Sequence, residues 1–259
     1  MFGSYLHSFA LENGRKVFVP SPQGRDAGDQ IQRNLRARWR IPSYFYHLRR
    51  GGHIAAVGHH LHDHVFATLD ISGFFDSVTR TKAYRALRGL GLDHEEAWEM
   101  ACQSCVEKTH GKRDFSIPCG FPQSPLVASI ALDRSALGRA MNRIVRSRHA
   151  RLSCYVDDII FSGREQEAVE SARRELIVGA RLSNFVFNAE KSQAPGPSVE
   201  VFNINLTHRS MSLTDERMRG FEEVVRTGQS TAATRAVLAY VRSVNTSQAD
   251  QLETLGHVP

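Results

Sequence analysis

Two adjacent carboxylates, Asp157 and Asp158, lie between two apolar segments in the second half of the chain. Residues 152–156 and 159–161 are rich in β-forming side chains, which predicts two short strands with both aspartates in the turn between them. Neighbouring strand residues point to opposite faces of a sheet, so a turn is where two of them can serve one site. Two carboxylates held together favour a positive partner, and hard oxygen ligands suit Mg²⁺.

A third carboxylate strengthens this prediction. Residues 65–71 form a predicted buried strand that ends at Asp70, and a helix is expected to begin near Thr79, with Asp76 as its cap. Three carboxylates around one pocket form the ligand set for two Mg²⁺ ions roughly 3.5–4 Å apart, with Mn²⁺ as the alternative metal, and such ions stabilise the attacking and leaving oxygens of phosphoryl transfer. The competing interpretation is a set of turn aspartates that bind no metal.

Four segments occur in an order that resembles motifs A to D of reverse transcriptases. They are Asp70 with Phe-Phe-Asp at 74–76, Gly-Phe-Pro-Gln-Ser-Pro-Leu at 120–126, Tyr-Val-Asp-Asp at 155–158 and Asn-Ala-Glu-Lys-Ser at 188–192. The compact Pro-Gln-Ser-Pro form is similar to that of bacterial defence-associated (anti-phage) reverse transcriptases, which are related to retron and group II intron reverse transcriptases. The resemblance covers nearly the whole chain and implies an RNA-directed DNA polymerase, a nucleotidyltransferase.

The implied fold is α+β, a right-hand polymerase with fingers, a palm in which an antiparallel sheet packs on helices, and a short thumb. Residues 1–64 would form the fingers, with 79–118 partly fingers and palm helices. Residues 65–206 would form the palm with motifs A to D, and 207–259 the primer-grip hairpin and short helical thumb. The sequence pattern predicts a strand over 15–19 and helices over 26–40, 93–108, 125–148, 165–182, 214–226 and 231–244.

The resemblance also implies roles for individual side chains. Asp70, Asp157 and Asp158 are the implied catalytic metal ligands, and Ile71 is assigned to both the metal and the nucleotide sites. Lys191 matches the lysine of motif D, which either donates a proton to the leaving pyrophosphate or only neutralises charge.

Three further positions are implied to contact the incoming deoxynucleoside triphosphate. Arg15 matches a fingers arginine whose guanidinium pairs with phosphate oxygens, the alternative being an ordinary surface arginine. Phe75 matches the steric gate against a ribose 2′-hydroxyl, the alternative being a core phenylalanine, a role that Phe74 can fill instead. Gln123 matches a glutamine that lies against the incoming sugar and the template.

The formal net charge of +6 and the isoelectric point near 9.4 favour a polyanionic partner. Arginines and histidines cluster in the first quarter of the chain, interleaved with Trp39, Tyr44, Phe45 and Tyr46. Arginine supplies phosphate contacts and aromatic rings supply stacking surfaces for single-stranded bases, although a solvated basic helix is the alternative. The predicted nucleic-acid contacts are Arg33, Arg36, Arg38, Arg40, Arg49 and Arg50.

The composition also disfavours several classes of protein. No apolar run approaches the ~20 residues of a membrane span and no signal peptide is evident, so no membrane partner is expected. Four cysteines in 259 residues do not suggest a disulfide framework, which favours a reducing cytoplasm. Cys102 and Cys105 are spaced like half a zinc site, but buried helix cysteines are the favoured interpretation.

The resemblance suggests a biological role in bacterial anti-phage defence. The expected partners are an RNA template in the form of a structured non-coding RNA, deoxynucleoside triphosphates and the DNA product. A chain this short is expected to depend on a partner, which is that RNA, a second protein or another copy of itself. The alternatives are a retron-type reverse transcriptase that makes RNA-linked DNA and a non-catalytic RNA-binding scaffold.

Overall fold

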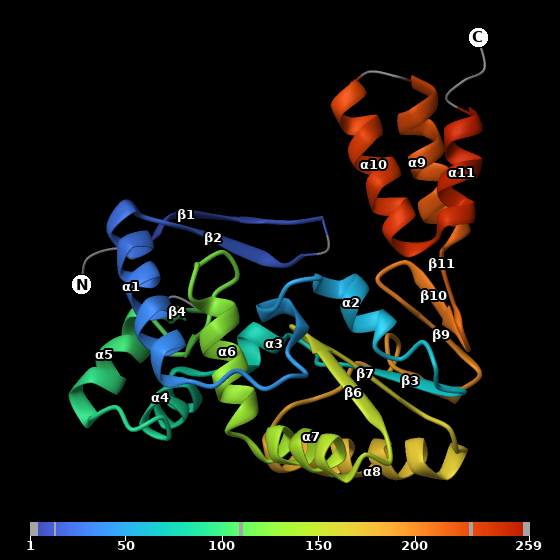
Figure 1. Cartoon of the computed structure of the whole chain (residues 1–259). Coiled ribbons are helices and arrows are strands. Elements are labelled where there is room, and N and C mark those ends of the chain that lie inside the picture. The colour runs from blue at the N-terminus through green and yellow to red at the C-terminus, as the bar shows by residue number, and fades with distance from the viewer. Residues whose placement is uncertain (1–4, 13, 109–110, 228–229, 256–259) are drawn as a thin grey trace.

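The computed structural model describes residues 5–12, 14–108, 111–227 and 230–255. At its centre lies an antiparallel sheet of four strands in the order β6–β7–β3–β8 (Figure 1). Its strands are β3 (Val65–Asp70), β6 (Arg151–Tyr155), β7 (Asp158–Gly163) and β8 (Gln193–Gly196). Helices α7 (Ala136–Ser147) and α8 (Gln166–Leu182) cover one face of this sheet.

The two middle strands of the sheet are apolar along most of their length because both of their faces are covered. Phe161 and Leu69 belong to the main hydrophobic core, which they share with buried residues of α7 and α8. Phe66 and Ile160 belong to a second buried cluster, together with Val57 of α2 (Gly52–Gly58) and residues of the C-terminal part of the chain. The sheet therefore joins two cores, as a palm-like layer between helices requires.

The long helix predicted over 125–148 is wrong, because the chain forms two helices there. Helix α6 (Ser124–Asp133) ends before Ser135, whose hydroxyl accepts a hydrogen bond from the Gly138 amide (3.1 Å) and caps α7. The two helices meet so closely that a Cβ at Gly138 would lie 2.2 Å from the Leu132 carbonyl oxygen. The capping serine and this glycine mark the break, and the apolar periodicity continues across it.

The N-terminal part begins with a hairpin of β1 (Tyr5–Ala10) and β2 (Lys16–Pro20), so the strand predicted over 15–19 is present. Helix α1 runs over Pro22–Arg38, four residues ahead of the predicted start, because Ser21 caps it and proline suits its first turn. Helices α4 (Arg80–Arg88) and α5 (His94–Gln103) pack together next to α1.

Two further predictions in this part are corrected. Helix α5 ends at Gln103 instead of near Lys108, since β4 (Val106–Glu107) leaves the helix to pair with β5 (Phe115–Ser116). Thr79, not Asp76, caps α4, because its hydroxyl accepts a hydrogen bond from the Lys82 amide (3.3 Å), whereas Asp76 belongs to the short helix α3 (Phe74–Ser77).

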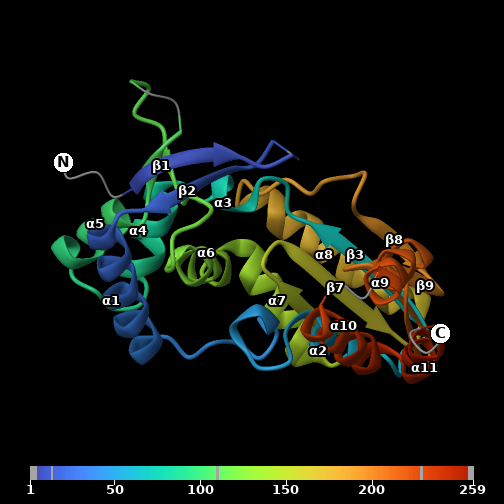
Figure 2. The ribbon, with the colours of Figure 1, turned by 90° about the horizontal axis from the view of Figure 1, so that it is seen from above.

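The C-terminal part consists of a three-stranded sheet and three helices. The strands β9 (Ser198–Val201), β10 (Ile204–Thr207) and β11 (Ser210–Leu213) lead into α9 (Asp215–Thr227), α10 (Thr231–Val244) and α11 (Thr246–Leu255), of which the last was not predicted. This bundle and the β1–β2 hairpin lie on the side of the central sheet away from α7 and α8 (Figure 1), over different ends of the molecule (Figure 2). Within the described residues, no helix combines the length and apolar character needed to cross a membrane.

Candidate active site

The acidic cluster, by which we mean Asp70, Asp157 and Asp158, is assembled by strand pairing. Asp70 is the last residue of β3 and its Cα is paired with that of Asp158, the first residue of β7. The Ile71 amide donates a hydrogen bond to the Asp157 carbonyl oxygen (2.9 Å), which fastens the β6–β7 turn to the end of β3. The third carboxylate is therefore beside the other two, as predicted.

The turn itself is tighter than the sequence suggested. Tyr155 pairs with Asp158, so the turn holds only Val156 and Asp157, and Asp158 belongs to a strand. Val156 has a φ of +60°, a left-handed conformation that is unfavourable for a β-branched residue. Such an outlier persists only where the surrounding structure holds it.

His47 is the side chain that holds this turn. The Val156 amide donates to its Nδ1 (2.9 Å), so Nε2 carries the proton and donates to the Ser129 hydroxyl (2.8 Å), which in turn donates to the Pro125 carbonyl (2.7 Å). Burial lowers the pKa of His47 to about 4, which keeps the ring neutral near pH 7. His47 lies in the early cluster of arginines and histidines, and its role could not be inferred there because only the fold brings residue 47 to residue 156.

Burial and mutual repulsion change the acidity of the cluster. Burial, followed by the charges of Asp157 and Asp70, raises the pKa of Asp158 to about 7. Burial also raises the pKa of Asp157, to which Asp70 adds a smaller upward contribution. Arg15 and Lys191 act in the opposite direction on both carboxyl groups, so the cluster is short of positive charge.

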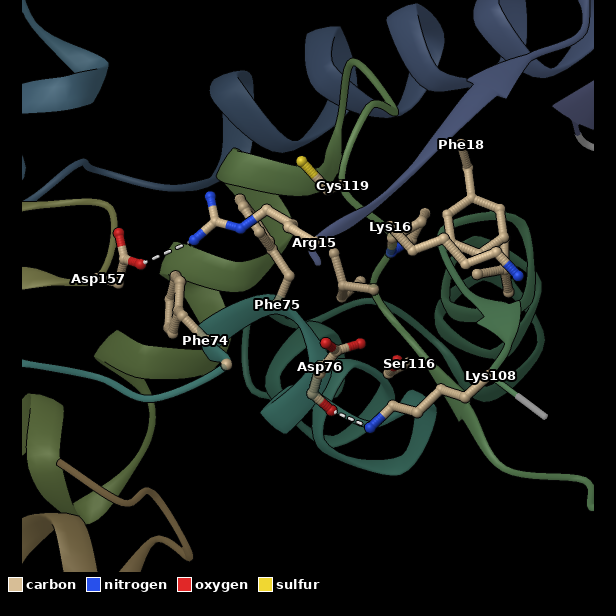
Figure 3. A pocket seen from close by; sticks show the side chains of 14 residues that line it. Arg15, Lys16, Phe18, Phe74, Phe75, Asp76, Lys108, Ser116, Cys119 and Asp157 are labelled. Atoms are coloured by element: carbon tan, nitrogen blue, oxygen red, sulfur yellow. Dashed lines mark hydrogen bonds and ion pairs between the residues drawn. The ribbon is translucent and has the colours of Figure 1, made fainter. Parts of the chain in front are cut away.

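A cavity of about 340 Å³ opens beside the turn (Figure 3). Arg15, directly before β2, reaches across it, and its guanidinium lies 3.6 Å from the Asp157 carboxylate. Phe74 is 2% exposed and belongs to the core, whereas Phe75 keeps part of its ring surface free at the cavity wall. The cavity is also lined by Lys16 and Lys108, which belong to none of the motifs in the sequence.

The loop after α8 brings Lys191 to the cluster. The Asn188 amide donates to the Asp70 carbonyl oxygen (2.8 Å), and the Asp70 amide donates to the Ser192 hydroxyl (3.2 Å). These two bonds tie both ends of the 188–192 segment to the end of β3. Lys191 is exposed, and its charge lowers the pKa of Asp157 and Asp158.

Gln123 does not lie where the motif predicted. Its side chain is fully buried, its Nε2 donates to the Gln103 carbonyl oxygen (3.2 Å), and its Oε1 is so close to α1 that a Cβ at Gly28 would lie 2.3 Å away. Because α6 begins at the next residue, the short loop turns this side chain toward α1 instead of the cavity.

The early basic region is divided between surface and core. All six predicted nucleic-acid contacts, Arg33, Arg36, Arg38, Arg40, Arg49 and Arg50, are exposed. Three of the four interleaved aromatics are not free for stacking, since Trp39, Tyr44 and Phe45 are 4%, 2% and 0% exposed, whereas Tyr46 is only partly buried. For these three the prediction is wrong, and Trp39 and Tyr44 turn inward to donate hydrogen bonds to the Asp133 carboxylate (both 3.1 Å).

The chemistry of the acidic cluster fits a divalent cation, since its donors are hard carboxylate oxygens that burial and repulsion leave in need of positive charge. Within the described residues, however, no group of three or more His, Cys, Asp or Glu side chains is already arranged around a metal position, and this holds for the acidic cluster and for Cys102 and Cys105. The Asp157 carboxylate is turned toward Arg15 instead.

Comparisons with known proteins agree with this geometry. A family model described as reverse transcriptase (RNA-dependent DNA polymerase) matches residues 11–257. The retron Mx65 reverse transcriptase of Myxococcus xanthus is 27% identical over 217 residues, which cover 74% of this chain and 49% of that protein. The chain thus spans about half the length of this curated relative.

Solved structures show the same fold. A foamy viral protease-reverse transcriptase in complex with double-stranded DNA has a TM-score of 0.52 at 14% identity and covers 97% of this chain and 43% of that chain. Telomerase from Candida albicans, in complex with a fragment of telomeric RNA, has a TM-score of 0.53 at 9% identity and covers 90% of this chain and 49% of that one. The α+β right-hand polymerase fold predicted from the sequence is confirmed.

Proposed function

Because the chain belongs to the reverse transcriptase (RNA-dependent DNA polymerase) family, we propose that it is an RNA-directed DNA polymerase that adds deoxynucleotides to a primer. The observation that carries this proposal is the pairing of Asp70 with Asp158 beside Asp157, at the mouth of a cavity that Arg15 spans. In this assignment residues 1–64 act as fingers, 65–206 as palm and 207–259 as primer grip and thumb.

Asp70, Asp157 and Asp158 would hold two Mg²⁺ ions, with Mn²⁺ as a substitute. When bound, such ions lower the cost of charge on the attacking and leaving oxygens of phosphoryl transfer. The side chain of Ile71 is apolar and buried, so only its main chain is available for its proposed metal and nucleotide contacts. Its amide already fixes the turn that carries Asp157.

The walls of the cavity supply the proposed nucleotide contacts. Arg15, with Lys16 and Lys108 of the same cavity lining, would bind the triphosphate, since a guanidinium pairs with two phosphate oxygens at once. Phe75, the phenylalanine that keeps exposed surface, would exclude a ribose 2′-hydroxyl and so select deoxynucleotides. Lys191, fastened beside the acids, would protonate the pyrophosphate or neutralise its charge.

The biological setting of the proposal is bacterial anti-phage defence in the cytoplasm, with a structured non-coding RNA as template and either a second protein or another copy of the chain as an additional partner. The likeness to a retron reverse transcriptase supports a second candidate, an enzyme that joins its DNA product to RNA. A 2′–5′ linkage in the product would identify that activity.

The proposal is tested with purified protein, a primed RNA template, Mg²⁺ or Mn²⁺, and each deoxynucleotide or ribonucleotide in turn. We expect incorporation of deoxynucleotides that is lost in an Asp157→Asn, Asp158→Asn variant and in EDTA. Incorporation that survives in the variant would refute the assignment of the acidic cluster. Absence of incorporation under every condition, with RNA binding retained, would favour the non-catalytic scaffold.

A further inference from the structure

A second hollow in the molecule, of about 720 Å³, shares no lining residue with the cavity at the acidic cluster. It lies between the C-terminal end of α1, the C-terminal end of α6 and one side of α7. We call it the arginine groove, because six arginines line it: Arg38, Arg40, Arg134, Arg139, Arg143 and Arg146. All six side chains are exposed.

Among the residues that the structure describes, Asp133 is the only carboxylate that lines the arginine groove, and it is already engaged by neutral donors. Its Oδ2 accepts a hydrogen bond from the Trp39 indole (3.1 Å), and its Oδ1 accepts from the Tyr44 hydroxyl (3.1 Å) and the Asn142 amide (3.2 Å). Asp133 therefore holds the floor of the groove together and forms no ion pair with the arginines within the described residues. The positive charge of the groove remains available to a ligand.

Most of the groove arginines also lack an acidic partner elsewhere. Only two of the six form an ion pair with a described residue: Arg38 pairs with Glu96 and Arg143 pairs with Glu175. Arg40, Arg134, Arg139 and Arg146 form no ion pair with any described residue. Four unpaired guanidinium groups around one hollow repel each other, and a polyanion removes that repulsion while it releases its own counterions.

The positive surface continues beyond the groove. A neighbouring hollow of about 490 Å³ is lined by Arg49, Arg148 and Arg151. Asn142 and Arg146 of α7 line the first hollow and Val145 lines the second, so the two hollows flank the C-terminal half of one helix. Arg139 and Arg146 are seven positions apart, about 10 Å along a helix, which spreads the charge over an extended track.

The composition of this track distinguishes between classes of nucleic acid. Proteins that bind single strands offer exposed aromatic rings on which bases stack. The arginine groove has one aromatic residue among its described lining residues, Trp39, which is 4% exposed and whose indole N–H is already donated to Asp133. The neighbouring hollow adds Tyr46, which is partly buried and whose ring lies 5.3 Å from the Arg49 guanidinium that covers it. Guanidinium groups without a stacking platform suit a duplex, whose phosphates are outside and whose bases are covered.

From these features we propose that the arginine groove is a docking site for double-stranded segments of RNA, separate from the catalytic cavity. It binds the phosphate backbone of a folded RNA while a single-stranded part of the same molecule is copied at the acidic cluster. This inference rests on the proposed function for its choice of RNA over DNA. Arg38, Arg40 and Arg49, predicted as nucleic-acid contacts from the sequence, belong to this track.

The test is the affinity of the full-length protein for a blunt RNA hairpin with a long stem, measured by fluorescence anisotropy over a series of salt concentrations. The variant is Arg134→Gln, Arg139→Gln, Arg146→Gln, which removes three unpaired charges and no ion pair. We expect affinity near 0.15 M salt to fall about 10- to 100-fold, and the slope of log K against log salt to fall by about three.

The matched control is Arg85→Gln, Arg181→Gln, Arg226→Gln, which removes three exposed arginines of α4, α8 and α9 outside the groove. A control that loses as much affinity as the groove variant would overturn the proposal, as would an unchanged affinity of the groove variant. Thermal unfolding of both variants shows whether they are folded, and the single substitution Arg146→Gln replaces the triple variant if that one is not.

Two further arms separate this inference from the proposed function. A DNA duplex of equal length that binds with the same groove dependence would overturn the choice of RNA. Groove-dependent binding of the RNA hairpin by wild-type protein that incorporates no nucleotide would support the groove and refute the proposed polymerase. If the wild type incorporates nucleotides and the groove variant binds the hairpin as tightly as the wild type does, the polymerase proposal would be supported and the groove proposal refuted.

Discussion

Asp157 and Asp158 are held by strand pairing and main-chain hydrogen bonds, one in the half-buried β6–β7 turn and the other at the start of β7, whereas Arg139 and Arg146 extend into solvent from one helix. Both regions gather charges of one sign. In the acidic cluster the fold imposes the repulsion, because short side chains on rigid strands cannot move apart. In the arginine groove long side chains limit the repulsion by spreading into water.

This difference has a physical consequence for what each region can do. Buried carboxylates in fixed positions attract a compact cation strongly and set its position, which suits chemistry on a single phosphate. Exposed guanidinium groups are screened by salt and adapt to many phosphate positions, which suits a long polyanion. The acidic cluster should therefore be sensitive to single substitutions, and the arginine groove only to several at once.

The largest expected effect is that of Asp158→Asn. We expect nucleotide incorporation to fall about 1,000-fold or more, since one preorganised charge at the reacting phosphate is removed. The free energy of unfolding in metal-free buffer should stay unchanged or rise by about 1 kcal/mol, because the amide removes a buried charge and its repulsion by Asp157 and Asp70. Single-turnover incorporation and urea unfolding in EDTA measure the two quantities.

The same substitution at Asp133 provides the control. Asp133 accepts hydrogen bonds from Trp39, Tyr44 and Asn142, so Asp133→Asn loses well-satisfied acceptors and should lower the free energy of unfolding by about 1–3 kcal/mol. If the free energy of unfolding rises in Asp158→Asn and falls in Asp133→Asn, the acidic cluster reduces the stability of the fold. A loss of stability at Asp158 as large as at Asp133 would contradict it.

The sequence was sufficient to predict much of this arrangement. The fold class and the approach of Asp70 to Asp157 and Asp158 were predicted because local patterns and motif order constrain both. The inward position of Trp39 and Tyr44 depends on Asp133, some 90 residues away, and no local pattern contains that contact. The same holds for Gln123, whose direction is set by the distant Gly28.

The break between α6 and α7 could have been predicted, because a serine that can cap a helix precedes Gly138. Apolar periodicity runs through both helices and hides it. The hydrogen bonds through which His47 joins Val156 to Ser129, which we call the His47 clamp, could not have been predicted. Nothing near His47 in sequence distinguishes it from the other early histidines. Its role depends on a fold that brings Val156 and Ser129 to opposite sides of its ring.

The second expected effect is a contribution of the His47 clamp to the pH dependence of the free energy of unfolding, a contribution that the arginine groove does not make. The unfolded chain binds a proton at His47 below pH 6.5, whereas the folded protein excludes it until about pH 4. The contribution of His47 to stability is therefore fully present above pH 6.5 and falls as the pH drops through this window, by about 2 kcal/mol at pH 5. The raised pKa of Asp158, about 7, acts in the opposite direction over the same range, because the folded protein takes up a proton there that the unfolded chain does not. Urea unfolding of the wild type and of a His47 variant at pH 7 and pH 5 therefore measures the part that belongs to His47.

His47→Gln is the variant that isolates this contribution, because a glutamine offers an acceptor to Val156 and a donor to Ser129 but does not titrate. Relative to the wild type, the free energy of unfolding of this variant should be about 2 kcal/mol higher at pH 5 than at pH 7, since Asp158 and the other buried histidines contribute equally to both proteins. The Arg146→Gln variant leaves the hydrogen bonds of His47 intact, so it should show the wild-type pH dependence. Equal pH dependence of all three proteins would exclude the clamp as its source.

The smallest expected effect is that of Arg146→Gln by itself. Because this guanidinium forms no ion pair with a described residue, the free energy of unfolding should change by less than about 0.5 kcal/mol. By comparison, Arg151→Gln should lower the free energy of unfolding by about 1–2 kcal/mol, since Arg151 lies 3.3 Å from the Asp63 carboxylate, which is 7% exposed and would lose its ion pair.

The affinity of Arg146→Gln for an RNA hairpin should fall about two- to fivefold at 0.15 M salt and approach that of wild type near 0.5 M, because screening shortens the reach of an exposed charge. A loss of affinity that persists at high salt would mean that Arg146 makes a contact as specific as those in the acidic cluster, and the contrast between the two regions would not hold.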